Sequence, residues 1–360
     1  MGLLECLRLA AGGRGYKLAS MRINIGRREF LWATALGSAT LFGPLALSSA
    51  AEPANWNPPL PDIERRVKVR GGNIYVRANG NLKGIRAPVL MLHGGPGYNH
   101  ADFLAILKLA DERAVILYDQ LDAGLSDQPN NPGNWSVERF VSEIDAIRAS
   151  FDLNQLHLVG HSWGSALAMQ YAARQPAGLT SLTVSGPYFS TRTWEASTLA
   201  EVGTLPGPVR EAINEHERAG TTDDPAYQDA IIVYYKQYLE RHPEPDYVKK
   251  YKERTGIKLA PVVYKGMWGP AEIRSSGILR TYDGESLLGE IRVPTLVICG
   301  EYDEMSPAAA APLAKRIQDA RMVVVSDSGH MISLDQPDIY VRTVREHLAR
   351  ADEVSARTRK

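Results

Sequence analysis

Residues 156–174 read LHLVGHSWGSALAMQYAAR, and this stretch decides the fold. The apolar run Leu156–Val159 leads into Gly160-His161-Ser162-Trp163-Gly164, and a helix-compatible run, Ser165–Arg174, follows. A strand that enters a tight glycine turn and leaves as a helix lifts the central hydroxyl clear of the sheet edge, at the positive end of the helix. The alternative is an ordinary glycine-rich loop, and the surrounding sequence has to decide between the two.

Outward from this stretch, short apolar runs alternate with helix-length amphipathic segments. Five further runs have the length of a strand buried on both faces: Val89–Leu92, Ala114–Tyr118, Leu182–Val184, Thr295–Ile298 and Met322–Val325. Helices are expected over 136–151, with Ser136 as the cap, and over 163–174, 308–317 and 337–349. A hairpin is expected from Val67–Val69 and Ile74–Val76. The alternation predicts an α/β domain with a mostly parallel sheet and helices on both faces.

The alternation fails once, over residues 188–290. This segment has helix-like sequence without a clear strand, and it is rich in tyrosine: Tyr227, Tyr234, Tyr235, Tyr238, Tyr247 and Tyr251. We expect a helical cap inserted between two strands of the sheet. The α/β core is then built from two parts of the chain, residues 52–187 and 291–360.

Composition excludes several classes of protein. Of the 360 residues, 44% are hydrophobic and 23% charged, with 41 basic and 41 acidic side chains, which is an ordinary globular balance. No global charge is available to attract nucleic acid or an anionic membrane, so neither is an expected partner. Only two cysteines are present, Cys6 and Cys299, too few for a disulfide framework or a cysteine metal cluster.

The first 51 residues have the layout of an export signal. Arg27 and Arg28 precede Phe30, Leu31 and an apolar stretch to Leu47, which small residues follow. Paired arginines at this place resemble the twin-arginine export motif. Cleavage after Ala50 or Ala51 would release a periplasmic or secreted protein without stable membrane insertion.

Two points about this segment stay open. The apolar stretch is only slightly too short to cross a bilayer, so an uncleaved membrane anchor is the alternative to a cleaved signal. The start codon is either Met1 or Met21, because Met21 lies six residues before the arginine pair.

The chemistry centres on Ser162. A serine hydroxyl needs a histidine to take its proton and a carboxylate to orient that histidine. Asp303 follows the run Thr295–Ile298, and His330 follows Met322–Val325, so all three residues fall at the carboxyl ends of predicted parallel strands. We expect Ser162 as nucleophile, His330 as base and Asp303 as the orienting acid.

Other histidines and acids compete for these roles. Asp327 is the alternative acid, although it precedes His330 by only three residues. His157 is interpreted as structural, and His161 as a neighbour of the site rather than its base.

A second glycine-rich turn follows the strand Val89–Leu92. It reads His93-Gly94-Gly95-Pro96-Gly97, and it lies where a backbone amide is needed to stabilise an oxyanion. The second amide comes from the residue after the nucleophile. Gly95 and Trp163 are therefore the predicted oxyanion donors, although a purely structural turn would use the same glycines.

With these motifs in place, residues 63–350 resemble the proline iminopeptidase group of α/β-hydrolases, which includes tricorn-interacting aminopeptidases and amino-acid amidases. The resemblance rests on the motifs around Gly95, Ser162 and His330, on Tyr118-Asp119-Gln120, and on two more selective motifs, Met267–Glu272 and Gly300–Glu304. It implies the α/β-hydrolase fold with a helical cap. It also implies that Glu272 and Glu304 hold the free amino group of the substrate and that Tyr264 lies near the pocket.

The plain alternatives for these three residues are that Glu272 is solvated, that Glu304 caps the next helix, and that Tyr264 only packs. The chain also departs from the family pattern at Asp119-Gln120-Leu121-Asp122-Ala123-Gly124-Leu125-Ser126. Asp122 replaces a glycine, and Leu125 removes a cation. Because this loop is expected near the catalytic mouth, a preference for proline at the first position is in question.

Together these observations predict an exported serine aminopeptidase or amino-acid amidase. It would act through an acyl-enzyme on short peptides or amino-acid amides, and it would need no cofactor and no metal. A carboxylesterase or lactonase with the same triad is the second hypothesis, and a degenerate hydrolase that only binds ligands is the third. The sequence leaves the oligomeric state and the preferred first residue open.

Overall fold

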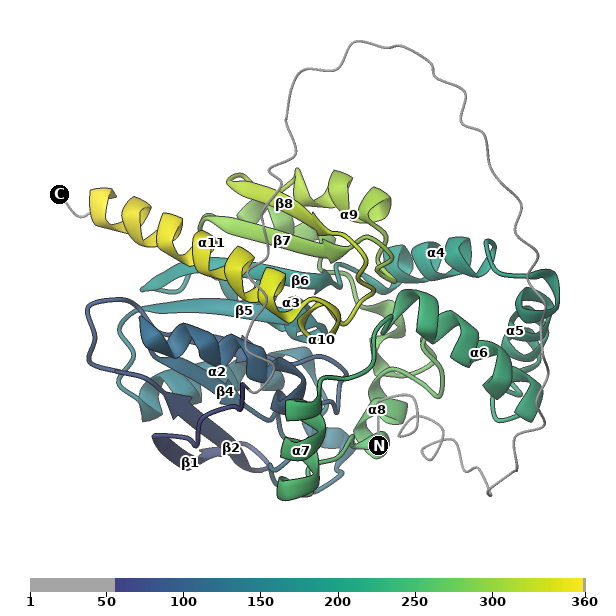
Figure 1. Ribbon diagram of the computed structural model, residues 1–360, viewed down its shortest axis with the longest axis horizontal. Helices are drawn as coiled ribbons and strands as arrows, with labels where there is room; N and C mark the ends of the chain where they lie inside the picture. Colours follow the sequence, from purple (N-terminus) through teal and green to yellow (C-terminus); the bar gives the residue numbers. More distant parts are fainter. Residues whose placement is uncertain (1–55, 359–360) are drawn as a thin grey trace, which may run out of the picture.

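The computed structural model describes residues 56–358, and within them the chain forms an eight-stranded sheet with helices on both faces (Figure 1). The strand order is β1-β2-β4-β3-β5-β6-β7-β8. β1 and β2 pair antiparallel, as do β2 and β4, and the remaining pairs are parallel. The predicted α/β class is confirmed. The expected export signal in residues 1–51 lies outside the described residues.

The strands begin and end near the predicted positions, but several are longer. They are β1 (Ile63–Val69), β2 (Gly72–Asn79), β3 (Val89–Leu92), β4 (Val115–Tyr118), β5 (Leu156–Ser162), β6 (Leu179–Pro187), β7 (Thr295–Gly300) and β8 (Ala320–Val325). The outer strand β1 is largely exposed, whereas every residue of β3, β4, β6 and β7 is buried. Full burial on both faces is the reason that these strands read as continuous apolar runs.

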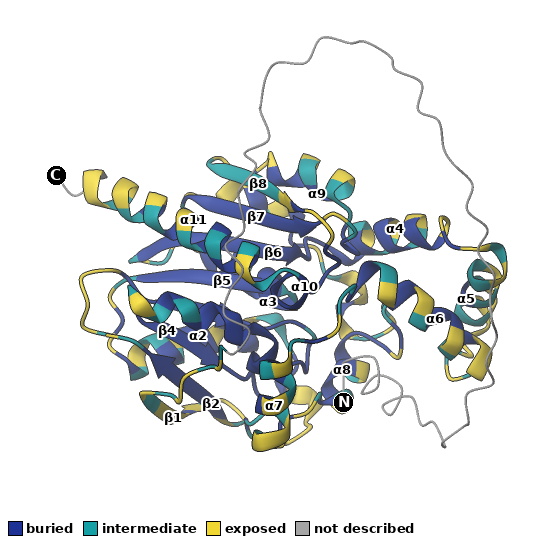
Figure 2. Ribbon diagram, in the orientation of Figure 1, coloured by how far each residue is buried: buried dark blue, intermediate teal, exposed yellow. Residues whose placement is uncertain are grey.

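Two hydrophobic clusters lie on opposite faces of the sheet. Alternate residues of β3 divide between them, with Leu90 and Leu92 in one cluster and Val89 and Met91 in the other. The first face is covered by α2 (Val137–Ser150), α3 (Trp163–Ala173) and α9 (Pro307–Ala314). The second is covered by the 3-10 helix η1 (His100–Asp111) and by α11 (Pro337–Thr358). Figure 2 shows the central strands as an almost continuous buried layer.

Helix η1 was not predicted from the sequence. Nine of its twelve residues are buried, so it carries no clear polar face and therefore no amphipathic period. Helix α2, in contrast, begins where the sequence predicts, because the Ser136 side chain accepts a hydrogen bond from the backbone N–H of Arg139.

The segment between β6 and β7 is helical. It contains α4 (Thr191–Val202), α5 (Gly207–Ala219), α6 (Pro225–Tyr238), α7 (Asp246–Thr255) and α8 (Pro261–Met267), followed by the 3-10 helices η3 (Ile278–Thr281) and η4 (Glu285–Glu290). In Figure 1 this segment, which we call the cap, lies beyond the carboxyl ends of the strands. A bridge between Ser190 and Asp283 joins the two ends of the cap.

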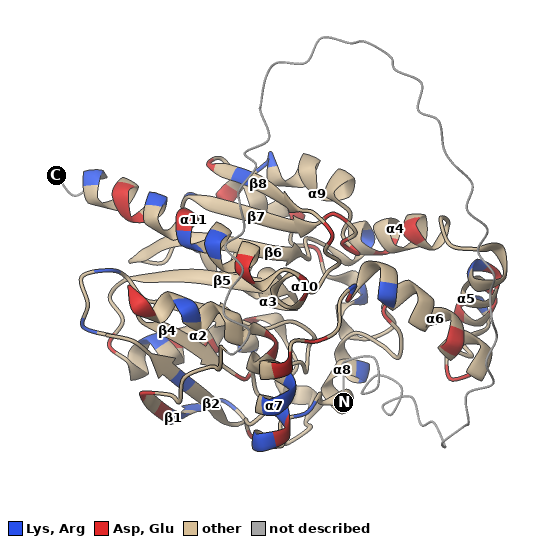
Figure 3. Ribbon diagram, viewed as in Figure 1, with Lys and Arg blue, Asp and Glu red and all other residues tan. Residues whose placement is uncertain are grey.

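Charged residues of both signs are distributed over the helices and loops, whereas the central strands carry very few (Figure 3). No helix within residues 56–358 is both long enough and apolar enough to cross a membrane. Because the central strands carry few charges, charged groups at the ends of the strands come mainly from loops and cap helices.

Candidate active site

The Ser162 elbow is held by contact between backbone segments. Ser162 lies between β5 and α3 with φ 54° and ψ −123°, a conformation with positive φ that is unusual for a residue with a side chain. A Cβ atom on Gly160 would lie 2.2 Å from the carbonyl oxygen of Gly164, and one on Gly164 would lie 2.2 Å from that of Leu92. Both positions therefore need glycine, and the close packing that they allow presents Ser162 at the end of the sheet.

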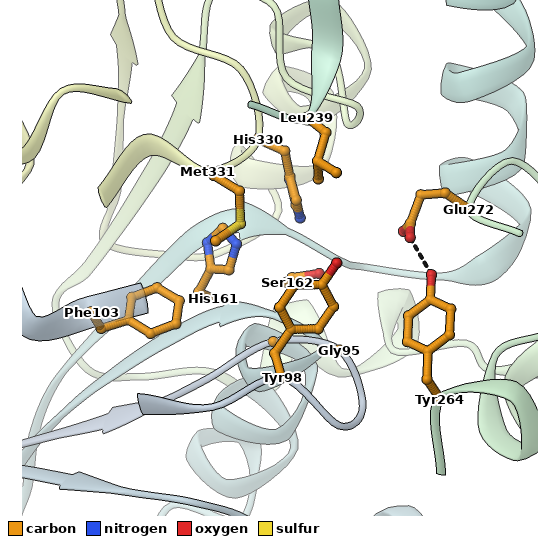
Figure 4. A pocket seen from close by; sticks show the side chains of 11 residues that line it. Gly95, Tyr98, Phe103, His161, Ser162, Leu239, Tyr264, Glu272, His330 and Met331 are labelled. Carbon is orange, nitrogen blue, oxygen red and sulfur yellow. Dashed lines mark hydrogen bonds between the residues drawn. The ribbon is translucent and has the colours of Figure 1, made fainter. Parts of the chain in front are cut away.

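His330 and Asp303 come together beside Ser162. Asp303 Oδ1 accepts a hydrogen bond from Nδ1 of His330 at 2.8 Å, and both side chains are buried. The carboxylate also accepts from the backbone N–H groups of Gly300 (3.2 Å) and Met305 (3.1 Å), so its orientation is fixed. In Figure 4 the His330 ring points into the cavity toward Ser162. This is the arrangement in which a histidine can take a proton from a serine.

The alternative acid, Asp327, is directed elsewhere. Its side chain is 59% exposed and pairs with Arg241 and His242. Asp327 lies outside the site because it follows β8 in a left-handed turn (φ 52°) that turns away from His330.

The two remaining candidate histidines have different surroundings. His157 is bound to Ser181 (2.7 Å) and Asp352 (3.0 Å). His161 borders the cavity, with its ring centroid 4.6 Å from that of His330. Burial first, and then the charges of His330 and His93, lower the pKa of His161 well below its ordinary value, so His161 is neutral near neutral pH.

Gly95 and Trp163 meet at Ser162, where an oxyanion would form. All three residues border a second, smaller cavity, which is partly open to solvent. Gln120 holds this region from behind: its amide Nε2 donates to the carbonyl oxygen of His93 (2.8 Å), and its Oε1 accepts from the Trp163 indole N–H (2.9 Å). Gln120 thereby fixes the glycine turn relative to the elbow. The sequence contained the Asp-Gln pair, but nothing in its pattern indicated this bridging role.

Ser162 thus lies between two cavities, both of which Glu272 borders. The larger one is drawn in Figure 4. Apart from glycines and the residues already named, its walls are Tyr98, Phe103, Leu239, Tyr264 and Met331. The smaller one has mostly aromatic walls: Trp163, Tyr188, Trp194, Trp268 and Leu279. Ser162 is therefore accessible from two sides, and each cavity combines aromatic or aliphatic walls with the carboxylate of Glu272.

Glu304 has no exposed surface, and neither of its carboxylate oxygens has a hydrogen-bond partner among the described residues. The hydroxyl of Tyr234 lies close enough to lower the pKa of Glu304, but it donates its hydrogen bond to Glu201 Oε2 at 3.1 Å. Burial, followed by the charges of Glu272, Glu201 and Asp303, raises the pKa of Glu304 well above its ordinary value. A buried carboxylate without a partner is unfavourable unless a ligand supplies one.

Glu272 is half-buried and borders both cavities from the cap, whereas Glu304 borders neither. Its Oε2 accepts a hydrogen bond from the hydroxyl of Tyr264, which leaves Oε1 for another donor (Figure 4). Burial raises its pKa as well. Tyr264 borders the cavity and orients Glu272, so it does more than pack. Glu272 in the cap lies close enough to Glu304 in the core for its charge to raise the pKa of Glu304.

A third carboxyl group, Glu201, was not found from the sequence. It lies near the end of α4, is buried, and has its pKa raised to about 10 by burial and by Asp303. At neutral pH it is therefore protonated, which limits the negative charge beside Glu304. The hydroxyl of Tyr234 in α6 donates a hydrogen bond to Glu201, a contact that no sequence motif records.

The loop that differs from the family pattern, residues 119–126, borders neither cavity. Asp122 adopts φ 65°, and its carboxylate accepts hydrogen bonds from the backbone N–H of Asn130 and the indole N–H of Trp135 (2.8 Å). The turn therefore tolerates aspartate at this position. Leu125 packs against the core, and none of residues 121–126 borders either cavity. The expectation that this loop shapes the catalytic mouth is wrong, because only Gln120 reaches forward from it.

Two other residues of the site went unnoticed in the sequence. Gly186, with φ 48°, lies against both histidine rings, and a Cβ atom there would be 2.7 Å from Cε1 of His161 and 2.7 Å from Cε1 of His330. Trp194 packs edge-on against His330 with a centroid distance of 5.2 Å. The sequence shows a glycine at the end of a strand, where glycine can indicate a close contact with a neighbouring group. Nothing in the sequence pattern indicates the role of Trp194.

The arrangement brings the Ser162 hydroxyl next to an imidazole that is bonded to a carboxylate and next to the backbone of Gly95 and Trp163, with Glu272 at the same cavities. Such a set can cleave an acyl bond next to a cation. Within residues 56–358 no three His, Cys, Asp or Glu side chains are grouped so that they could hold a metal ion.

Comparison with known proteins gives concordant results. A family model described as the alpha/beta hydrolase fold matches residues 87–337. The proline iminopeptidase of Heyndrickxia coagulans is 34% identical over 284 residues, which cover 78% of this chain and 97% of that protein.

Two solved structures are similar to this chain in sequence and in fold. The proline iminopeptidase of Mycobacterium smegmatis is 30% identical with a TM-score of 0.73, and VinJ is 32% identical with a TM-score of 0.75. Each match covers 81% of this chain and all of the other chain.

Replacing Gly186 by alanine tests the packing beneath the histidines. The new methyl group would displace His330, and alanine would be strained at this positive φ. A displacement of about 1 Å at a catalytic group costs about 100-fold in rate, so we expect a loss of that size in turnover of a nitrophenyl ester. The matched control is Gly289→Ala, because a Cβ atom there meets nothing within 4 Å. Equal activity of the two variants would contradict the contact.

Proposed function

We propose that this chain, which belongs to the proline iminopeptidase group of the α/β-hydrolase family, is an exported serine aminopeptidase. It would release N-terminal proline, and related N-terminal residues, from short peptides or amino-acid amides. One observation carries the substrate class: beside the triad lies Glu304, fully buried, with two carboxylate oxygens that have no partner among the described residues. A substrate ammonium group supplies the missing donors.

The proposed reaction uses Ser162, His330 and Asp303. Nε2 of His330 takes the proton of the Ser162 hydroxyl while Oγ attacks the carbonyl carbon of the first residue. Asp303 holds Nδ1–H of the imidazole and stabilises the imidazolium that forms. The backbone N–H groups of Gly95 and Trp163 donate to the oxyanion.

Collapse of this intermediate breaks the C–N bond, and His330 gives its proton to the leaving amine. The acyl-enzyme then reacts with water, which His330 deprotonates in the same way. The first residue is released and Ser162 recovers its proton. No step in this sequence requires a group other than the side chains and amides named here and one water molecule.

The ammonium group is the basis of selectivity. It would lie between Glu304 from the core and Glu272 from the cap, in charge-assisted hydrogen bonds. A substrate without this group leaves Glu304 buried and unpaired, which is unfavourable. An esterase or lactonase would use the same triad, but it would give Glu304 no partner, and for that reason the aminopeptidase accounts for more of the site.

The mainly aromatic cavity beside Gly95 and Trp163 fits the acyl side of the substrate. It adjoins the oxyanion donors, and its walls include Tyr188, Trp194 and Trp268. The proline ring is compact and apolar, and it would bury its methylene groups against these rings. The other cavity lies beside His330, which protonates the leaving amine, and so fits the leaving side.

Replacing Glu304 by glutamine tests the clamp. The amide is similar in shape but carries no charge, so we expect kcat/KM for a prolyl anilide to fall by about 100-fold, the effect of a lost charged partner of about 3 kcal/mol. Hydrolysis of a nitrophenyl ester that lacks an amino group should change little. The control, Glu290→Gln, alters an exposed residue whose carboxylate pairs with Arg292. Equal losses on anilide and ester would remove Glu304 from this role.

The pH dependence gives an independent test of the same clamp. Because the pKa of Glu304 is raised, the carboxyl is protonated at low pH and binds an ammonium group poorly. The ratio of kcat/KM for the prolyl anilide to that for the ester should therefore rise with pH, until the amine itself loses its proton. Glu304→Gln should abolish the rise. A ratio in the wild-type protein that is constant from about pH 5 to about pH 9 would count against the clamp.

Export is part of the proposal and rests on the sequence of residues 26–51. If Arg27 and Arg28 direct transport, the protein should appear in the periplasm or medium with its first residues removed after Ala50 or Ala51. Changing both arginines to lysine should leave the precursor inside the cell, whereas Arg22→Lys should not. Mass spectrometry of cell fractions measures both outcomes. Uncleaved protein in the membrane fraction would instead favour the anchor.

A further inference from the structure

The cap is hydrogen-bonded directly to the loop that carries His330. We define the cap linker as residues 238–242, which comprise the last residue of α6 and the first part of the connection to α7, and the catalytic loop as residues 327–335, which end in the short helix α10 (Ile332–Asp335). The backbone N–H of His330 donates to the carbonyl oxygen of Tyr238 at 2.8 Å, and that of Met331 donates to Leu239 at 2.8 Å. The backbone of the catalytic histidine is therefore held by the cap and not by the sheet alone.

Asp335 joins the same two segments with one buried carboxylate. Its Oδ1 accepts hydrogen bonds from the backbone N–H groups of Arg241 (3.0 Å) and His242 (2.9 Å) in the cap linker. Its Oδ2 accepts from the backbone N–H of Gly329 (2.7 Å) and from the Ser328 hydroxyl (3.4 Å) in the catalytic loop. Hydrogen bonds to a charged acceptor are about twice as strong as neutral ones, so this carboxylate is a strong connection.

Arg241 extends the connection to the loop of the catalytic acid. Its guanidinium lies 3.8 Å from the ring centroid of Tyr302, the residue before Asp303. Its Nε also pairs with Asp327 at 3.3 Å. One linker of the cap thus contacts the loops that carry two members of the triad.

The two segments are in close backbone contact at Gly329. A Cβ atom on Gly329 would lie 2.8 Å from the carbonyl oxygen of Tyr238 and 2.9 Å from that of Leu239. The Leu239 side chain also borders the cavity beside Ser162. A group bound in this cavity therefore contacts the residue whose carbonyl holds the catalytic loop.

We infer that Asp335 is a positioning residue, which fixes His330 by binding the catalytic loop to the cap linker as one unit. This inference rests on the proposed function in one respect, the role of His330 as the base. It gives the cap a second role besides holding Glu272, because the cap carries part of the framework that sets the position of the imidazole.

The variant Asp335→Asn tests this assignment. Asparagine keeps the shape but has one oxygen, so it can accept from the linker or from Gly329, and its NH₂ group then faces a backbone N–H on the other side. We expect the rate at which a fluorophosphonate labels Ser162 to fall by about 10- to 100-fold, together with kcat for both anilide and ester. KM for the anilide should stay within about twofold of the wild-type value, because Glu272 and Glu304 are unchanged.

The matched control is Asp338→Asn, three residues further along the chain, where the exposed carboxylate pairs with Lys108 and does not contact the catalytic loop. It should label and turn over at the wild-type rate. A lower melting temperature of Asp335→Asn with wild-type labelling and kcat, measured well below that temperature, would show a purely structural role and overturn the assignment. A loss confined to amine substrates would overturn it as well, because that pattern belongs to the ammonium clamp.

If Asp335→Asn does not fold, a second variant, Arg241→Gln, tests the same linker. It removes the contacts of the Arg241 guanidinium group with Tyr302 and Asp327. It should lower labelling and kcat together by about 3- to 10-fold, and unchanged rates would overturn the proposal. The rate of fluorophosphonate labelling also tests the role of Asp335 independently of the proposed aminopeptidase activity. Should the wild-type protein label readily but leave prolyl substrates intact, the aminopeptidase proposal fails, while the labelling rates of the variants still test Asp335.

Discussion

Contact between backbone segments beneath Ser162 is the constraint on which the site depends. Gly160 and Gly164 bring the elbow of β5 and α3 so close to the end of β3 that no side chain fits between them. The same approach brings the turn with Gly95 beside Trp163, and Gln120 secures it from behind. Because these contacts involve the main chain, the positions of nucleophile and oxyanion donors follow from the sheet itself, and the rest of the site is arranged around them.

The acidic groups beside the triad are a stability cost that function explains. Three carboxyl groups, Glu201, Glu272 and Glu304, have raised pKa values because burial disfavours their charge. Folding a chain around a buried carboxyl group without a partner, such as Glu304, is unfavourable, and proteins retain such groups where a ligand completes them. The tyrosines that made the cap recognisable contribute to the same acidic site. Tyr234 and Tyr264 donate to Glu201 and Glu272 and so fix the directions of these side chains.

The cap also contributes to the catalytic geometry. The catalytic acid is held by its own loop, through the amides of Gly300 and Met305, whereas the catalytic histidine receives its backbone partners from Tyr238 and Leu239 of the cap linker. Nucleophile and acid thus depend mainly on the sheet, and the base depends on sheet and cap together. Substrate recognition by Glu272 and positioning of His330 therefore involve the same inserted segment.

The sequence by itself determined the α/β class, the family, the elbow at Ser162 and the positions of Asp303 and His330 at the ends of strands, because local pattern and strand order fix these features. It could not decide between exposed and buried states of Glu304, and it gave no sign of Glu201, Trp194 or Asp335, whose partners lie far away in the chain. It also misplaced the loop at Leu125, since whether a loop faces a cavity or the core depends on the segments packed around it. Those contacts exist only after the cap has folded onto the sheet, and for that reason only the tertiary structure assigns them.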